Sequence, residues 1–371
     1  MSRLDTRQNN RIYTSMKKTW TGSIAFTWWG TWGHVQPIVS LIEYAKNHSE
    51  LELDCKQLYR FGEAWWQEEY ACFTCAWVAF VPVLSGKIRR DRSFSSVYKN
   101  VYDMFCVLTG IVQCCFLLKK YRIGKVFCKW WYVALPVCIA SWILRIPIVL
   151  HESDMHAWLV NRIVSKIALH RCVWFAWMFP QEKVTWQILS DRLLSYTHPP
   201  IQEKTQVLVM WWSQWASSLF DVVIDIRASW NYDMTFHVLL GTKNQAYASV
   251  FSQHDQVITY TFLDQTSLAS VYALCDVSLT RGSATSLAEQ QLFGIKKIIV
   301  PLPWTWWNHQ FYNALEFVSS YDDILVEQNQ YMSDALHTFL NKLMWYKKEF
   351  TWVDQSHLSH AKKVIRSLLL E

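Results

Sequence analysis

The sequence predicts an α/β protein made of two doubly wound domains, each with a parallel sheet between helices. Short apolar runs of strand length alternate with amphipathic segments at helical spacing, the pattern of a parallel sheet with crossover helices. The alternation stops at residues 190–204 and then starts again. The chain has 371 residues, 51% of them apolar and 18% charged, which is enough for two full cores and unlike a disordered chain.

The first strand–loop–helix unit lies at residues 24–47. An apolar run ends at Thr27, and a segment with apolar residues at helical spacing, from Ile38 to Ala45, follows it. The loop between them, residues 28–33, lies where such folds hold a phosphate at a helix N-terminus. We therefore expect a ligand-facing loop at this position.

Three further strands and three helices are expected in the first half. The strands lie at Val78–Val83, Lys125–Cys128 and Ile146–Leu150, and the helices at about Ser95–Lys120, Leu135–Leu144 and Asn161–Ala168. Residues 132–150 are strongly apolar, but Pro136, Arg145 and Pro147 interrupt them. A buried helix followed by a strand explains this segment better than a membrane span does.

The second half repeats the design of the first. A domain boundary is expected around Pro199-Pro200, and the next strand, Gln206–Met210, leads into a Trp-rich loop and a helix. Later strands are expected at Val238–Leu240, Val257–Phe262, Val277–Thr280 and Lys297–Val300. The last 20 residues read as a helix that is apolar on one face. The expected units are an N-terminal domain (20–195), a C-terminal domain (204–348) and a helix (349–371) that packs back on the N-terminal domain.

The basic residues gather in two groups. The net charge is +6, and the groups lie at residues 87–92 and 119–125, the second directly after the apolar run Val101–Leu118. This run and the second group suit docking on an anionic membrane face. A core helix with a cationic C-terminal turn suits them equally well, so both interpretations stay open.

Neither a disulfide framework nor a metal site is expected. The ten cysteines lack framework spacing, and the pair Cys72 and Cys75 has no second Cys or His pair to complete a zinc site. Free, mostly buried thiols of a cytosolic protein are the better interpretation. Residues 1–18 are polar and basic without an apolar core, so no signal peptide is expected.

Five motifs occur in the order and spacing of one enzyme family. They are Gly30-Thr31-Trp32-Gly33-His34 with Pro37; Ser85-Gly86-Lys87; His151-Glu152-Ser153-Asp154 with Asn161; Ser213-Gln214-x-Ala216; and Arg281-Gly282-Ser283-Ala284 with Glu289, His309-Gln310 and Asn313. Over residues 22–350 the sequence resembles the MurG family of peptidoglycan glycosyltransferases. The resemblance implies the GT-B architecture, in which two Rossmann-like doubly wound domains face each other across a cleft.

The resemblance also implies an activity. The family moves N-acetylglucosamine from UDP-N-acetylglucosamine to undecaprenyl-diphospho-muramoylpentapeptide, the step from lipid I to lipid II in peptidoglycan synthesis. It implies an inverting reaction with no metal and no cofactor, in a cytoplasmic protein that is peripheral on the inner face of the cell membrane. No nucleic-acid partner is implied, and the sequence contains no nucleic-acid-binding motif.

Roles for individual residues follow from the same resemblance. His34, at the start of a helix, is the candidate catalytic residue, either as general base or as a ligand of the acceptor diphosphate. The implied acceptor-binding residues are Thr31, Tyr132 and Asn161. The implied donor-binding residues are Ser213, Gln214, Arg281, Glu289, His309, Gln310 and Asn313. Glu289 is implied to bind the ribose, because a carboxylate accepts hydrogen bonds from both ribose hydroxyls. Without the resemblance, helix capping is the default role for such polar residues.

Tryptophan stands where the family has glycine in the ligand-facing loops. The chain has 23 Trp and only 10 Gly. The replaced positions are Trp28, Trp29, Trp32, Trp130, Trp131, Trp158, Trp211, Trp212 and Trp215, with Trp306 and Trp307 beside the donor-sugar motif. A Cβ forced into a left-handed conformation costs on the order of 1–2 kcal/mol, and an indole would occupy the place of a phosphate. Gln202 stands for an arginine expected to clamp the donor diphosphate.

Three functions follow from these observations. The first is the family's glycosyl transfer, impaired in this chain. The second is a non-catalytic scaffold, altered or designed, with tryptophan-filled phosphate loops. The third is a platform for single-stranded nucleic acid or a glycan on the aromatic pairs, which the distance of the basic groups from those pairs in sequence disfavours.

Overall fold

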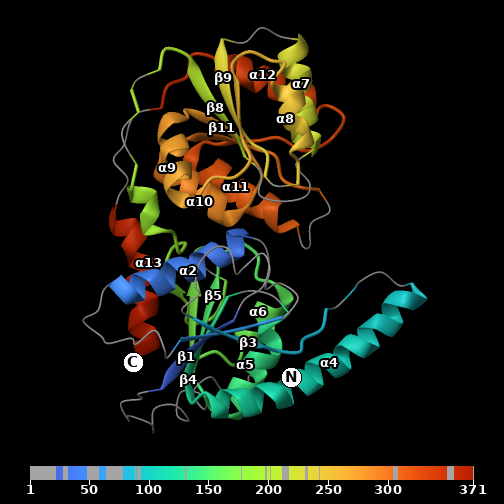
Figure 1. The fold of residues 1–371 in the computed structure, drawn as a ribbon, viewed down its shortest axis with the longest axis vertical. Helices are drawn as coiled ribbons and strands as arrows, with labels where there is room; N and C mark the ends of the chain where they lie inside the picture. The colour runs from blue at the N-terminus through green and yellow to red at the C-terminus, as the bar shows by residue number, and fades with distance from the viewer. Residues whose placement is uncertain are drawn as a thin grey trace.

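The computed structural model contains two α/β domains, one above the other in Figure 1. It describes residues 22–27, 32–47, 58–63, 78–87, 89, 93–129, 132–176, 178–196, 199–200, 202–210, 217–229, 233–241, 243–303, 308–348 and 355–370. Each domain is a parallel sheet with helices on its faces, so the predicted fold class is confirmed.

The N-terminal domain is built on a seven-stranded sheet in the order β3-β2-β1-β4-β5-β6-β7, with every pair parallel. Its strands are β1 (Ser23–Thr27), β2 (Leu58–Gly62), β3 (Ala79–Pro82), β4 (Ile123–Cys128), β5 (Ile148–Glu152), β6 (His170–Val173) and β7 (Lys183–Val184). Its helices are α2 (Trp32–Asn47), α4 (Phe94–Lys120), α5 (Ala134–Ile143) and α6 (Leu159–Val164), with a 3₁₀ helix, η3 (Asp191–Leu194), after β7. The central strands are buried along nearly their whole length, as expected for a sheet covered on both faces.

The C-terminal domain has a six-stranded parallel sheet in the order β10-β9-β8-β11-β12-β13. Its strands are β8 (Thr205–Met210), β9 (Met234–Leu239), β10 (Val257–Tyr260), β11 (Val277–Thr280), β12 (Lys296–Ile299) and β13 (Ile324–Leu325). Its helices are α7 (Ser217–Ser229), α8 (Ala246–Phe251), α9 (Gln265–Leu274), α10 (Ala284–Leu292), α11 (His309–Tyr321) and α12 (Met332–Lys342), and the last described helix is α13 (Gln355–Leu370).

The structure differs from the sequence prediction in two ways. The helix predicted at Asn161–Ala168 ends at Val164, because the next residues form tight turns into β6, with Ala168 N donating to Val164 O at 2.8 Å. Strands β2, β6, β7 and β13 were not predicted. They are short, and β2 contains Arg60, so none of them has a long apolar run to reveal it.

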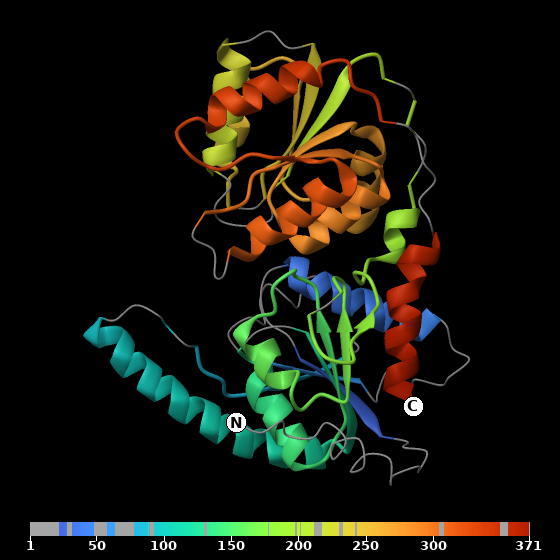
Figure 2. The same cartoon turned by 180° about the vertical axis from the view of Figure 1, so that it is seen from behind.

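Helix α4 decides between the two interpretations of the apolar run Val101–Leu118. Its N-terminal half extends away from the domain (Figure 2) and is exposed on nearly every side. Ten of its large apolar side chains are exposed: Phe94, Val97, Tyr98, Val101, Tyr102, Met104, Phe105, Leu108, Val112 and Phe116. The core-helix interpretation is therefore wrong for this half, and only the C-terminal half packs against α5. In the described part of the chain α4 is the one helix long and apolar enough to cross a membrane.

Two glycines let the segment after β3 run closely along α4. A Cβ on Gly110 would lie 2.1 Å from the carbonyl oxygen of Leu84, and a Cβ on Gly86 would lie 2.2 Å from that of Asp103. The Gln113 amide oxygen accepts a hydrogen bond from Leu84 N at 2.8 Å. The segment and the helix therefore form one protruding unit.

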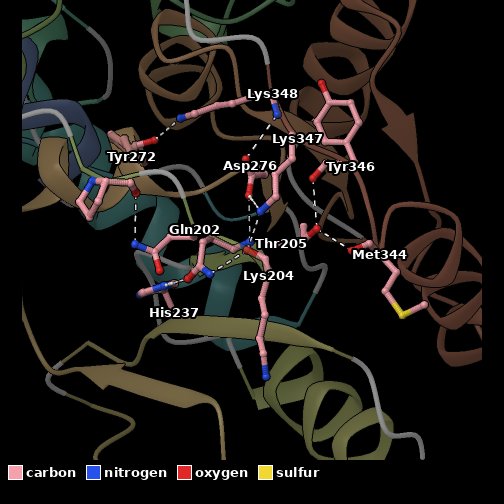
Figure 3. Close-up of polar contacts among 12 residues, drawn as sticks. Gln202, Lys204, Thr205, His237, Tyr272, Asp276, Met344, Tyr346, Lys347 and Lys348 are labelled. Carbon is pink, nitrogen blue, oxygen red and sulfur yellow. Dashed lines mark hydrogen bonds and ion pairs between the residues drawn. The ribbon is translucent and has the colours of Figure 1, made fainter.

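Asp276 fastens the two chain segments that connect the domains (Figure 3). Its carboxylate accepts from Gln206 N at 3.0 Å, at the start of β8, and from Lys347 Nζ at 3.3 Å, after α12. Lys347 also donates to the carbonyl of Lys204 at 2.6 Å. The segment that enters the C-terminal domain and the segment that leaves it therefore lie side by side.

The chain then returns to the N-terminal domain through α13. Its residues Ala361, Ile365 and Leu368 join the core formed by β1 and α2. Lys362 is fully buried, donates to the carbonyl of Leu189 at 3.0 Å and pairs with Asp191. The helix that follows the C-terminal domain in the chain thus packs on the N-terminal domain.

Candidate active site

The carboxyl ends of the two sheets meet through the loop that follows β5. Asn313 on α11 accepts a hydrogen bond from Met155 N and donates one to Asp154 Oδ1, both at 2.8 Å. It also donates to the carbonyl of Gly282, between β11 and α10, at 3.0 Å. Residues from the third and fifth sequence motifs are therefore in direct contact across the domain boundary.

Glu152, the last residue of β5, shapes this loop. Its carboxylate accepts from Ser153 N at 2.8 Å, Asp154 N at 3.0 Å, Asn161 Nδ2 at 2.7 Å and Trp158 N at 3.4 Å. Burial and the neighbouring Asp154 raise the pKa of Glu152 to about 7, although the hydrogen bonds oppose that shift. Asn161, an implied acceptor residue, is thus engaged inside the N-terminal domain.

A buried lysine follows β4 beside this loop. Lys129 Nζ contacts Ser153 Oγ, His151 Nδ1 at 3.2 Å and Gln187 Oε1 at 3.4 Å. Burial lowers the pKa of Lys129 to about 7, against the attraction of Glu152. Burial and Lys129 together hold the pKa of His151 well below its usual range, so its ring is neutral near pH 7.

Tyr132, the second implied acceptor residue on this side, is held by Glu63. Its hydroxyl donates to Glu63 Oε2 at 2.8 Å, and Ser85 Oγ donates to Glu63 Oε1 at 2.5 Å. Burial and the Glu63 carboxylate raise the pKa of Tyr132, so the phenol stays protonated. Lys87 lies over the Tyr132 ring, 5.2 Å from its centre. The second motif and the Tyr132 segment therefore form one polar cluster.

Glu289 lies in the second turn of α10, where it is 3% exposed. The Tyr272 hydroxyl donates to its Oε2 at 2.9 Å. Burial raises the pKa of Glu289 to about 7, while hydrogen bonds from Tyr272 and Gln265 oppose the shift. A ribose would have to displace the Tyr272 hydroxyl to reach both carboxylate oxygens.

Arg281 and Gln310 stabilise the segments around α10 and α11. The Arg281 guanidinium donates to the carbonyl of Val300 at 3.1 Å and to Ser218 Oγ at 3.0 Å. Gln310 Oε1 accepts from Leu302 N at 3.0 Å. Burial lowers the pKa of Arg281 to about 9, so the group remains largely cationic near neutrality.

Several implied site residues lie outside the described structure. They are Thr31, Ser213 and Gln214, together with most of the loop tryptophans: Trp28, Trp29, Trp130, Trp131, Trp211, Trp212, Trp215, Trp306 and Trp307. His34 belongs to the first turn of α2, and only its backbone is described. The predicted filling of the phosphate loops by tryptophan therefore concerns residues outside the described part of the chain.

The structure changes the interpretation of two departures from the family pattern, Trp158 and Gln202. Trp158 has a φ of −66°, so its backbone is not left-handed. The expectation that a Cβ would strain the backbone at this position is therefore wrong. Its indole donates to Asp154 Oδ2 at 3.0 Å, and its ring lies 5.1 Å from that of His309. Gln202 lies near the amino end of β8 (Figure 3), a strand's length from the loop at residues 211–216. It is therefore poorly placed to replace an arginine clamp on a donor diphosphate.

Comparisons with known proteins agree with this architecture. Residues 24–171 match the glycosyltransferase family 28 N-terminal domain, and residues 206–368 match the family 28 C-terminal domain. The UDP-N-acetylglucosamine–N-acetylmuramyl-(pentapeptide) pyrophosphoryl-undecaprenol N-acetylglucosamine transferase of Legionella pneumophila (strain Corby) is 30% identical over 302 residues, covering 76% of this chain and 77% of that protein. The chain belongs to the MurG family.

Solved structures show the same fold. Acinetobacter baumannii MurG superposes with a TM-score of 0.69 at 18% identity, covering 94% of this chain and 99% of that one. The spinosyn rhamnosyltransferase SpnG, solved with thymidine diphosphate, gives a TM-score of 0.60 at 10% identity, covering 93% and 99%. The chain is thus a glycosyltransferase by family, with the GT-B fold.

Sequence reasoning missed several polar residues of this candidate site. Lys129 has one visible signal, a lysine directly after a buried strand. Gln187 and Tyr272 have no such signal in the sequence, because each is hydrogen-bonded to a partner that is distant in the sequence. Gln187 Nε2 donates to Thr285 Oγ1 at 3.0 Å, and the Tyr272 hydroxyl donates to Glu289.

The raised pKa of Glu289 gives a pH prediction. Between its ordinary pKa of 4.5 and the folded value of about 7, the folded protein retains a proton that the unfolded chain has released. The free energy of unfolding therefore falls as the pH rises through this interval. Glu289→Gln should remove on the order of 1–3 kcal/mol of that fall, measured by urea unfolding at pH 5 and pH 8.

The matched control for this prediction is Glu327→Gln, at an exposed glutamate of the same domain. It should keep the wild-type difference between the two pH values. Equal pH dependence in wild type and Glu289→Gln would show that Glu289 is not a buried, proton-binding group.

Proposed function

We propose that this protein transfers N-acetylglucosamine from UDP-N-acetylglucosamine to an undecaprenyl-diphosphate-linked muramoyl acceptor. The observation that carries the proposal is the contact between the loop after β5 and the starts of α10 and α11. It brings the Glu152–Asn161 motif of one domain to the Gly282–Asn313 motif of the other. A reaction between two large substrates needs such a meeting of two binding surfaces.

The residues with proposed roles divide between the domains. On the donor side we assign Glu289 to the ribose and the start of α11, with His309 and Gln310, to the sugar. Ser213, Gln214 and Arg281 are assigned to the diphosphate region on the family pattern. On the acceptor side, His34 is the proposed base, and Thr31, Tyr132 and Asn161 shape the acceptor surface.

We further propose that the tryptophans of the donor loop weaken donor binding. The support is the sequence: Trp211, Trp212 and Trp215 stand where the family has glycines that bring backbone N–H groups to a phosphate. The alternative is a scaffold that binds no nucleotide sugar at all. Weakened binding and a blocked scaffold differ in the affinity of the wild-type protein for UDP-N-acetylglucosamine, which is low in the first case and absent in the second.

Reversion of the donor loop should restore affinity for UDP-N-acetylglucosamine. The triple variant Trp211→Gly, Trp212→Gly, Trp215→Gly should bind at least about tenfold more tightly than wild type in calorimetry, because backbone amides regain access to the diphosphate. Gln202→Arg is the control and should bring no gain, since it lies near the amino end of β8.

Each result of this titration decides one point. Micromolar binding by the wild type would contradict the impairment. No heat from either protein at millimolar nucleotide sugar would contradict the proposed transfer reaction. Binding by the triple variant alone favours the blocked scaffold.

We also propose that α4 docks the protein on the cytoplasmic face of the membrane. The support is its ten exposed large apolar side chains, which form a larger apolar surface than a soluble domain ordinarily leaves in water. Exposed cations flank it at Lys87, Lys99, Lys119 and Lys120. An apolar surface with a basic border suits an anionic bilayer.

Two glutamates on the exposed side of α4 should abolish this docking. The variant Phe105→Glu, Val112→Glu should lose at least about tenfold in binding to phosphatidylglycerol vesicles in a sedimentation assay, because two side chains that enter the bilayer become charged. The control Ile258→Glu, at an exposed apolar residue of β10, should bind as wild type does. Equal sedimentation of the double variant and wild type would contradict the proposal.

A further inference from the structure

The two domains touch at the carboxyl ends of their sheets through polar contacts around Asn313 and through apolar packing. Trp174 and Phe175, which follow β6, belong to one buried cluster with residues of α10 and α11, and the Trp174 ring lies 5.5 Å from that of Phe317. Asn313 is completely buried and Asp154 is 4% exposed. Every polar atom of the Asn313 side chain has a partner: Oδ1 accepts from Met155 N, and Nδ2 donates to Asp154 Oδ1 and to Gly282 O. Two of these partners belong to the N-terminal domain and one to the C-terminal domain.

The N-terminal side of the interface is held rigidly before it meets Asn313. Glu152 accepts from the amides of Ser153 and Asp154, which fixes the backbone of the loop. The Trp158 indole donates to Asp154 Oδ2, which leaves Oδ1 for Asn313. The Asp154 carboxylate is therefore oriented by its own domain.

The C-terminal side is fixed by close backbone packing. A Cβ on Gly282 would lie 2.1 Å from the carbonyl oxygen of Gln310, so the first turn of α11 rests directly on Gly282. This packing places the Asn313 amide within 3.0 Å of Gly282 O. Asn313 is thus as well oriented as Asp154.

Three further contacts surround the Asn313 bridge. The rings of His156 and Tyr312 are stacked at 4.0 Å with an interplanar angle of 5°. The Trp158 ring lies against His309, and Gln187 Nε2 donates to Thr285 Oγ1. All of them join the N-terminal domain, through the loop after β5 or the segment after β7, to the starts of α10 and α11.

We propose that Asn313 and Asp154 form a latch that holds the two domains together in the absence of substrates, with Asn313 as a positioning residue between the domains. The role differs from the donor-sugar contact implied by the family motif, because both N–H donors of the amide are already in use. A polar latch can open and reclose, since water replaces its hydrogen bonds at little net cost. The inference rests on these contacts and does not depend on the proposed reaction.

The test swaps the two side chains between positions 154 and 313. Amide hydrogen exchange is then measured at pH 8 without any substrate. Asn313→Asp sets a carboxylate against Asp154 Oδ1 and Gly282 O, so the Met155 amide should exchange at least about tenfold faster than in wild type. The double variant Asp154→Asn, Asn313→Asp restores the pair with the roles exchanged. The introduced amide at position 154 donates to the introduced carboxylate at position 313, and its oxygen still accepts from Trp158. The Gly282 carbonyl still faces the introduced carboxylate, so Met155 exchange should be at least about threefold slower than in Asn313→Asp without reaching the wild-type rate.

The control is Asn341→Asp, at an exposed asparagine of α12, which should leave Met155 exchange unchanged. Unchanged Met155 exchange in folded Asn313→Asp would overturn the latch. So would a double variant that exchanges as fast as Asn313→Asp. If Asn313→Asp does not fold, recovery of folding in the double variant supports the latch, and failure of both contradicts it. Substrate binding plays no part in these readouts, so a failure of the transfer reaction leaves the result unaffected.

Discussion

The carboxylate of Glu152 is the interaction on which the meeting of the two domains depends. A buried carboxylate is costly unless hydrogen bonds replace its water, and Glu152 has four donors within 3.4 Å. Two of them are the consecutive amides of Ser153 and Asp154, so satisfying the charge also fixes the backbone. The same residue therefore ends β5 and shapes the surface that the C-terminal domain contacts.

The domains are joined at two places with different chemistry. At the carboxyl ends of the sheets they meet through the hydrogen bond between Asn313 and Asp154, which water can replace, and through the apolar packing of Trp174 against Phe317. At the other end Asp276 holds the two connecting segments together, and α13 is anchored on the N-terminal domain by an apolar face and the buried Lys362. The anchored connecting segments lie away from the motif residues, and the Asn313 contact lies among them. This arrangement suits a protein whose domains separate and reclose around large substrates.

The sequence was sufficient for the fold and for the order of the motifs. Strands such as Ile148–Glu152 begin as continuous apolar runs, and α4 has an unmistakable length and composition, so both were predictable. The exposure of α4 was not, because the same residues suit a core helix and a membrane-facing one. Asp154 and Asn313 were both in motifs, yet nothing in the sequence indicates that they touch. Gln187 and Tyr272 were missed for the same reason, since their partners are distant in the sequence.

The most direct measurement is amide hydrogen exchange of the variant Glu152→Ala, with the β8–β13 sheet as the internal reference. Removing the carboxylate leaves the Ser153 and Asp154 amides without their acceptor. The account predicts that these amides and that of Met155 exchange at least about tenfold faster, while the reference sheet keeps its protection. Wild-type protection of all three amides in the folded variant would contradict it.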